Sequence, residues 1–126
     1  MKILFVCTGN TCRSPMAQVI LSNIVKKNKR KDIIVGSAGT DAWGGQPMMD
    51  GARLALTQCG EKLPKTPHKS TRFTIEMQKS FDRIIDVRGY LDPFGHRLEV
   101  YIELCKQLQT ACQKLYDEIC NNKQPT

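Results

Sequence analysis

Apolar and polar residues follow two different spacings along this chain, and the spacings predict both strands and helices. Short apolar runs rich in β-branched residues predict buried strands at residues 2–6, 33–35 and 82–87. Apolar side chains that recur every three or four positions predict helices at residues 15–27, 50–59 and 96–120. The chain therefore alternates between strands and helices, with a tail from Asn121 that is expected to fray.

The first strand, helix and strand form a βαβ unit of roughly thirty residues, which implies a parallel strand pair and a right-handed crossover. We therefore expect an α/β fold in a single domain that covers residues 1–126. In such sheets, ligands bind beyond the carboxyl ends of the strands. Residues 7–15 and 36–40 follow the first two strands, so they are expected at that edge.

The stretch that joins the first strand to the first helix is Cys7-Thr8-Gly9-Asn10-Thr11-Cys12-Arg13-Ser14-Pro15. A turn at this place leaves backbone N–H groups pointing into one concave space, and the positive end of the helix faces the same point. The stretch therefore predicts a site for an oxyanion such as phosphate. Cys7 begins the turn and Arg13 ends it, with five residues between them.

These two residues predict covalent phosphoryl chemistry. Aligned N–H dipoles and a nearby arginine favour the thiolate form of cysteine, and Arg13 can hold two phosphoryl oxygens through its planar fork. Cys7 is the candidate nucleophile, which attacks phosphorus to form a thiophosphate intermediate. Ser14 is predicted to cap the helix and to donate its hydroxyl to the Cys7 sulfur. The alternative is a buried cysteine at a strand end and an arginine on the surface.

The stretch from Cys7 to Ala17 resembles the phosphate loop of the low-molecular-weight protein tyrosine phosphatases, a family that includes bacterial members acting on phosphoarginine. The resemblance continues through Ser37-Ala38-Gly39-Thr40, His68 with Arg72, Leu91-Asp92-Pro93-Phe94-Gly95 and Leu98-Glu99-Val100-Tyr101. It implies a three-layer sandwich around a short parallel sheet. We expect three strands here, whereas family members have four.

The resemblance also implies a role for individual residues. It makes Cys7, Arg13 and Asp92 catalytic, with Asp92 as the general acid and later the base. The phosphate-binding residues would be Thr8, Gly9, Asn10, Thr11, Cys12 and Arg13, supported by Ser14, Ser37 and His68. Thr11 and Trp43 would line the substrate pocket, although packing of Trp43 on the edge of the core is an equal alternative.

The chain departs from the family pattern between Val87 and Asp92, where family members carry a further helix and a fourth strand. Only residues 88–91 cross this interval. Removing one whole helix-and-strand unit returns the chain to the same edge of the sheet, so Asp92 can still enter the site. The third strand would then become an exposed edge. We expect either the last helix or a second copy in a homodimer to cover it.

Composition limits the other classes of function. The net charge of +7 fits an anionic substrate, and much of it comes from residues 26–31, where cations complement a helix end. No nucleic-acid partner is therefore expected. No apolar run reaches membrane-spanning length, and no secretory signal precedes the first strand, so a cytoplasmic protein with six reduced cysteines is expected. The spacing of cysteines and histidines predicts no metal site, and no cofactor is expected.

The sequence thus predicts a phosphatase acting on phosphotyrosine, or on phosphoarginine, in a phosphorylated protein. Thr11 favours phosphoarginine by its resemblance to that branch, whereas Trp43 favours an aromatic substrate. Two alternatives stay open: an arsenate reductase that relays through Cys105 and Cys112, and a phosphate-binding module without catalysis. By the same resemblance, Cys7 and Cys12 form a reversible regulatory disulfide, with a packing role for Cys12 as the alternative.

Overall fold

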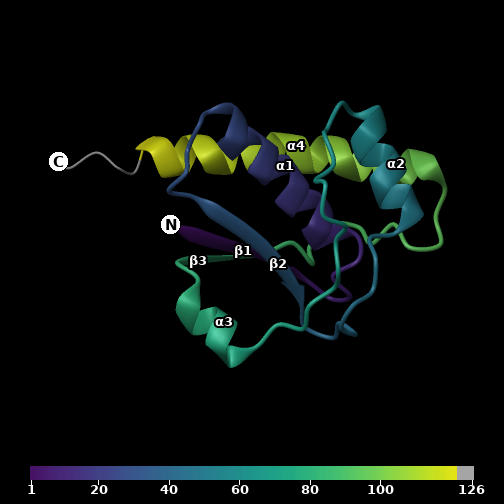
Figure 1. The fold of residues 1–126 in the computed structure, drawn as a ribbon. Helices are drawn as coiled ribbons and strands as arrows, with labels where there is room; N and C mark the ends of the chain where they lie inside the picture. Colours follow the sequence, from purple (N-terminus) through teal and green to yellow (C-terminus); the bar gives the residue numbers. More distant parts are fainter. Residues whose placement is uncertain (122–126) are drawn as a thin grey trace.

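The computed structural model describes residues 1–121, and the order of its elements confirms the α/β class (Figure 1). The strands are β1 (Lys2–Cys7), β2 (Ile34–Gly39) and β3 (Arg83–Asp86). The helices are α1 (Arg13–Lys27), α2 (Asp50–Gln58), α3 (Ile75–Ser80) and α4 (Leu98–Asn121). The expectation of a frayed tail concerns residues beyond Asn121, which lie outside the described part of the chain.

The sheet has the strand order β2-β1-β3, and both neighbouring pairs are parallel. Alternate residues of the central strand point to opposite faces and both faces are covered, which explains why β1 is apolar from Ile3 to Cys7. Ile3 and Phe5 pack in the main core with α1 and α4, whereas Leu4 and Val6 pack in a smaller cluster near α3. Figure 1 shows α1, α2 and α4 on one side of the sheet and α3 on the other. This arrangement confirms the predicted layers and the three-stranded sheet.

Helix α4 lies along α1 and α2 and buries one apolar stripe against them. Strand β3 remains an edge strand of the sheet: its Ile85 packs against the main core that includes α4, whereas Ile84 aligns with Leu4 on the opposite face and is 36% exposed. The exposure of Ile84 therefore does not test cover of the edge by α4, and cover by the last helix stays a prediction. Cover by a second copy stays a prediction.

Two local expectations also differ from the structure. Strand β2 continues to Gly39 because its small residues keep pairing with β1, up to the pair Cys7–Gly39. Helix α1 begins at Arg13, and Ser14 is therefore inside the helix and is not its cap. Cys12 holds the cap position without a side-chain capping hydrogen bond, and the Ser14 hydroxyl faces the Cys7 sulfur.

None of the helices within residues 1–121 combines the length and the apolarity that a membrane span requires.

The end of β2 approaches the loop after β1 so closely that Gly39 has no room for a side chain. A Cβ atom at this position would lie 2.9 Å from the Asn10 nitrogen and 2.9 Å from the Ala42 Cβ, and it would also meet the Thr8 carbonyl oxygen. We expect Gly39→Ala to lower the free energy of unfolding by about 1–3 kcal/mol, because backbone must move to relieve the contact. Urea denaturation measures this loss.

Gly36→Ala is the matched control on the same strand. Its Cβ would meet only side chains, with the Phe81 ring at 3.3 Å. A loss of stability at Gly36 as large as that at Gly39 would contradict the proposed clash with the loop.

Candidate active site

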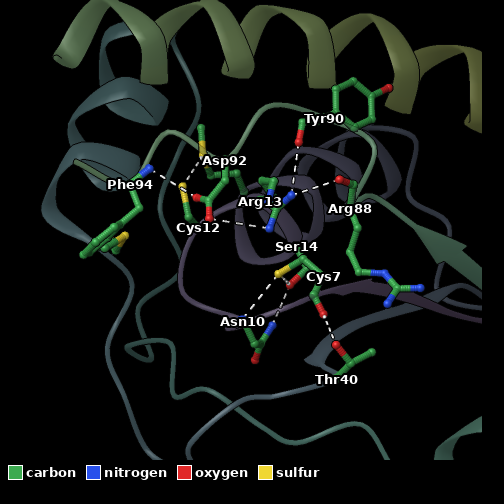
Figure 2. A network of polar contacts seen from close by, with 12 residues as sticks. Cys7, Asn10, Cys12, Arg13, Ser14, Thr40, Arg88, Tyr90, Asp92 and Phe94 are labelled. Atoms are coloured by element: carbon green, nitrogen blue, oxygen red, sulfur yellow. Dashed lines mark hydrogen bonds and ion pairs between the residues drawn. The ribbon is translucent and has the colours of Figure 1, made fainter. Parts of the chain in front are cut away.

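The sulfur of Cys7 lies at the end of β1 and receives hydrogen bonds from the loop that follows (Figure 2). The Asn10 backbone N–H donates to the Cys7 Sγ at 3.3 Å, and the Ser14 Oγ lies 2.8 Å from the same sulfur. The Asn10 Nδ2 donates to the Ser14 Oγ at 2.8 Å, so the serine hydrogen is left for the Cys7 sulfur or for the more distant Ala38 oxygen, at 3.4 Å. Both contacts stabilise negative charge on a thiolate.

Asn10 organises the loop from a left-handed backbone conformation, with φ of 56°. Its side chain is fully buried, and its Nδ2 donates to Ser14 and, at 3.0 Å, to Ser37. Its Oδ1 accepts from the Thr71 N–H at 2.8 Å, and its backbone oxygen lies 2.7 Å from the His68 Nε2. These contacts hold a conformation that is costly for most residues but tolerated by asparagine.

His68 is therefore placed behind the loop, as the family resemblance implies. Because a carbonyl oxygen can only accept, the His68 Nε2 must carry the hydrogen in this contact. Burial lowers the pKa of His68 from its ordinary 6.5, and the hydrogen bond to Asn10 opposes the shift only in part. The neutral ring with its hydrogen on Nε2 is thus the form that supports the loop.

Arg13 begins α1 with its guanidinium buried beside the same loop. Its Nη1 donates to the backbone oxygens of Arg88 at 3.0 Å and Tyr90 at 3.1 Å. Its Nη2 lies 3.7 Å from the Asp92 Oδ2. The short segment that joins β3 to Asp92 therefore supplies the acceptors that orient this guanidinium.

That segment is itself tied to the end of β3. The Asp86 carboxylate accepts from the Arg88 N–H at 2.9 Å and from the Arg88 side chain at 3.0 and 2.9 Å. These hydrogen bonds lower the pKa of Asp86. Asp86 thus fixes Arg88, whose carbonyl oxygen in turn receives a hydrogen bond from Arg13.

Asp92 reaches the site in spite of the shortened connection. Its side chain is 54% exposed, and the Asp92 Oδ1 accepts from the Phe94 N–H at 3.1 Å. Figure 2 shows the Asp92 carboxylate directed at Arg13, at the loop that carries Cys7 and Cys12. The structure brings together the thiol, the guanidinium and the carboxylate that the sequence predicted at one loop.

Comparison with known proteins now gives this loop its context. Residues 2–90 match the family described as low molecular weight phosphotyrosine protein phosphatase. The chain belongs to this family. A protein-arginine phosphatase of Geobacillus stearothermophilus is 32% identical, over 94% of this chain and 95% of that protein. The low molecular weight protein-tyrosine phosphatase PtpB of Staphylococcus aureus is 27% identical, over 95% and 100%.

A solved structure agrees with the sequence comparison. The YwlE arginine phosphatase from Geobacillus stearothermophilus superposes with a TM-score of 0.83 at 27% identity, covering 97% of this chain and 94% of that one. The alignment with PtpB runs over 141 positions, more than the 126 residues of this chain, so part of the relative has no counterpart here. The family match ends at residue 90, and Asp92 is thus placed by geometry rather than by that match.

Cys12 lies in the phosphatase loop as a buried thiol, 3.9 Å from the Met16 sulfur. Burial, followed by the charges of Asp92 and Cys7, raises the pKa of Cys12 to about 12. It is therefore a neutral thiol near neutral pH. Both Cys7 and Cys12 are free cysteines in the structure, and the regulatory disulfide between them stays a prediction.

The other residues predicted for the site differ in how exposed they are. Thr8 and Gly9 are exposed and Thr11 is partly buried within the loop. Trp43 is 79% exposed, which excludes packing on the edge of the core.

Cys105 and Cys112 lie in the buried stripe of α4, where burial raises the pKa of both thiols. Their placement therefore gives no support to a relay with Cys7. No group of residues that could hold a metal occurs within residues 1–121.

Sequence reasoning missed several groups that complete the site. The Gln18 Oε1 accepts from the Ser37 hydroxyl at 2.6 Å and so orients the serine that contacts Asn10. Gln18 follows Ser14 by four positions on α1, and this helical spacing could have indicated a shared face. The backbone groups of Thr71, Arg88 and Tyr90 that complete the site could not be identified from the sequence, because nearly every residue carries the same N–H and C=O.

The burial of His68 predicts how the stability of this protein depends on pH. Because its folded pKa is lowered, the unfolded chain binds the proton more readily. The stability contributed by neutral His68 is therefore complete above about pH 6.5 and is lost as the pH falls below that value. We expect the wild type to lose more unfolding free energy than His68→Gln between about pH 7 and about pH 5, measured by urea denaturation.

The exposed His96 provides the control for this experiment. We expect His96→Gln to retain the pH dependence of the wild type. An identical pH dependence for His68→Gln and the wild type would show that His68 does not carry the effect.

The contact chain from Asp86 to Arg13 predicts a positioning role for Asp86. Asp86→Asn removes the charged acceptor of Arg88, so the carbonyl oxygen that receives the Arg13 hydrogen bond is less well held. We expect the affinity for tungstate, a tetrahedral oxyanion, to fall about fivefold, measured by calorimetry. Asp82→Asn makes the same change of charge at the other end of β3, where Asp82 accepts from the Lys2 N–H. Equal effects of the two variants would refute the role of Asp86.

Proposed function

We propose that this chain is a cysteine-dependent protein phosphatase that forms a phosphocysteine intermediate on Cys7. The observation that supports it best is the Cys7 sulfur held by the Asn10 N–H and the Ser14 hydroxyl at a loop that begins α1. Arg13 and Asp92 lie at the same loop, 3.7 Å apart. Membership of the phosphatase family supports the same reaction class.

In the first step, the Cys7 thiolate attacks phosphorus, so that a sulfur–phosphorus bond forms as the bond to the leaving atom breaks. The Arg13 guanidinium and the loop N–H groups hold the other phosphoryl oxygens, which stabilises the charge of the transition state. Asp92, in its protonated form, gives its proton to the leaving oxygen of tyrosine or nitrogen of arginine. The leaving group therefore departs neutral.

In the second step, water attacks the phosphocysteine while the Asp92 carboxylate accepts its proton. The sulfur–phosphorus bond breaks, and inorganic phosphate leaves. The contacts from Ser14 and Asn10 stabilise the thiolate that departs, so the same contacts serve both halves of the reaction. Asp92 ends the cycle protonated, ready for the next substrate.

We propose phosphotyrosine in a phosphorylated protein as the substrate, with phosphoarginine as the alternative. Trp43 presents a 79% exposed ring in the loop after β2, and such a ring can stack on an aromatic leaving group. Thr11 and the 32% identity to a protein-arginine phosphatase favour the alternative. A phosphotyrosine peptide and a phosphoarginine peptide compared under the same conditions decide between them by kcat/KM.

Hydrolysis of para-nitrophenyl phosphate tests the mechanism. We expect Cys7→Ser to abolish turnover, because the alcohol is a far weaker nucleophile than the thiolate. Asp92→Asn should lower kcat about 10²–10⁴-fold, since the leaving group loses its proton donor.

Thr40→Ala is the control, because Thr40 lies next to the site and its hydroxyl makes one long hydrogen bond within residues 1–121, at 3.5 Å to the Cys7 oxygen. Tight tungstate binding without turnover in the wild type would refute catalysis and support a phosphate-binding module.

A further inference from the structure

A cavity of about 530 Å³ lies behind the phosphate loop, apart from the side where Asp92 meets Arg13. One wall is the face of α1 formed by Pro15, Gln18, Val19, Ser22 and Asn23, which recur at helical spacing. The other walls come from β2, Arg53 of α2 and the connection of residues 63–71. The volume is within the range of small-molecule sites.

The cavity combines flat apolar surfaces with cationic groups. Three prolines of the loops, Pro47, Pro64 and Pro67, line it together with the cations Arg53 and Lys69. No carboxylate is among its lining residues. This composition suits a ligand with a flat apolar body and one negative charge.

The charges nearby strengthen this inference. The Lys69 side chain is exposed and forms no ion pair with the described residues of the chain. Arg53 pairs with Asp50, outside the cavity lining. The other neighbouring carboxylate, Glu61, accepts from Asn23 at 2.9 Å and from Gln109 at 2.7 Å. Lys69 is thus the cation left to meet an anionic ligand.

The outer wall has hydrogen bonds at Lys62, His68 and Ser70. The Asn23 side chain donates to the Lys62 oxygen at 3.0 Å, and the Ser70 N–H donates to the Gln46 oxygen at 2.7 Å. Between these points, residues 63–67 make no hydrogen bond to any described residue. The wall can therefore adapt to a ligand without breaking hydrogen bonds.

The cavity also shares residues with the support of the phosphate loop. Ser37, His68 and Thr71 line it, and each of them hydrogen-bonds directly to Asn10. Gln18 lines it as well and holds Ser37. A ligand in the cavity would therefore contact residues that hydrogen-bond to Asn10, and the Asn10 N–H contacts the Cys7 sulfur.

We propose that this cavity binds a small organic anion with a flat apolar body, and that its occupancy is coupled to oxyanion binding in the Cys7 loop. The ligand packs on the prolines and α1, and Lys69 meets its charge at the rim. An occupied cavity restrains the residues that hold Asn10, so the loop loses less conformational freedom when it binds its own anion. The coupling rests on the proposed function, whereas the binding itself does not.

Titration of the full chain with 2-naphthoate, followed by amide NMR, tests the binding. Saturating tungstate is present, so that the Cys7 loop is occupied. We expect the amides of residues along 63–71 and of the cavity face of α1 to shift, and the neutral analogue 2-naphthamide to bind at least about fivefold more weakly. Absence of binding, or equal binding of the amide, would overturn the site.

Two lysines of the same connection provide matched variants. Lys69→Ala should weaken 2-naphthoate binding about fivefold, and Lys65→Ala should change it less than about twofold, since Lys65 is exposed and does not line the cavity. Ser22→Phe, which fills the cavity from α1, should abolish binding while the folded NMR spectrum is retained. Equal effects of Lys69→Ala and Lys65→Ala would show that the anion does not occupy this cavity.

Calorimetry measures the coupling directly. We expect 2-naphthoate to tighten tungstate binding, and tungstate to tighten 2-naphthoate binding by the same factor, as linkage requires. Unchanged affinities would refute the coupling while leaving the site in place. If tungstate does not bind at all, the proposed phosphatase function fails, and the 2-naphthoate titration without tungstate still decides the cavity.

Discussion

The structure of this site depends on the left-handed backbone of Asn10. In that conformation the Asn10 N–H points at the Cys7 sulfur, and the loop can turn within a few residues from β1 into α1. The conformation is held from outside the loop, by Ser37 of β2 and by His68 and Thr71 of the connection after α2. The reactive sulfur is thus positioned by residues far apart in the sequence, and the loop needs the whole sheet edge to keep its shape.

The shortened connection after β3 gives Arg13 a particular environment. Buried guanidinium groups need acceptors, because an unpaired buried cation is costly. Here the backbone oxygens of Arg88 and Tyr90 supply them, and Asp86 holds Arg88 in place. The few residues that cross the gap therefore orient the arginine and also bring Asp92 to the loop. Strand β3 is an edge of the sheet, and the groups at the end of the sheet lie together beside it.

Much of this arrangement could be predicted because its signals are local. The apolar run of β1, the helical spacing of α1 and α4, and the order of strands and helices require only the period of each element. The Cys7 to Arg13 spacing also indicates its chemistry locally, since both residues flank the same turn. The misassigned cap at Ser14 was local as well, but its hydroxyl bonds to Cys7, and this contact overrides the preference for a helix cap.

The sequence by itself thus determined the α/β class, the phosphate loop and the candidate nucleophile, because periodicity and turn chemistry act between near neighbours. Only the tertiary structure decided which backbone groups hold Asn10 and Arg13, that β2 extends to Gly39, and that α4 packs mainly on α1 and α2. The cavity behind the loop also depends on the tertiary structure, because its walls come from α1, β2, α2 and residues 63–71. The physical reason is that N–H and C=O groups are the same in every residue, so their partners follow from how distant segments pack.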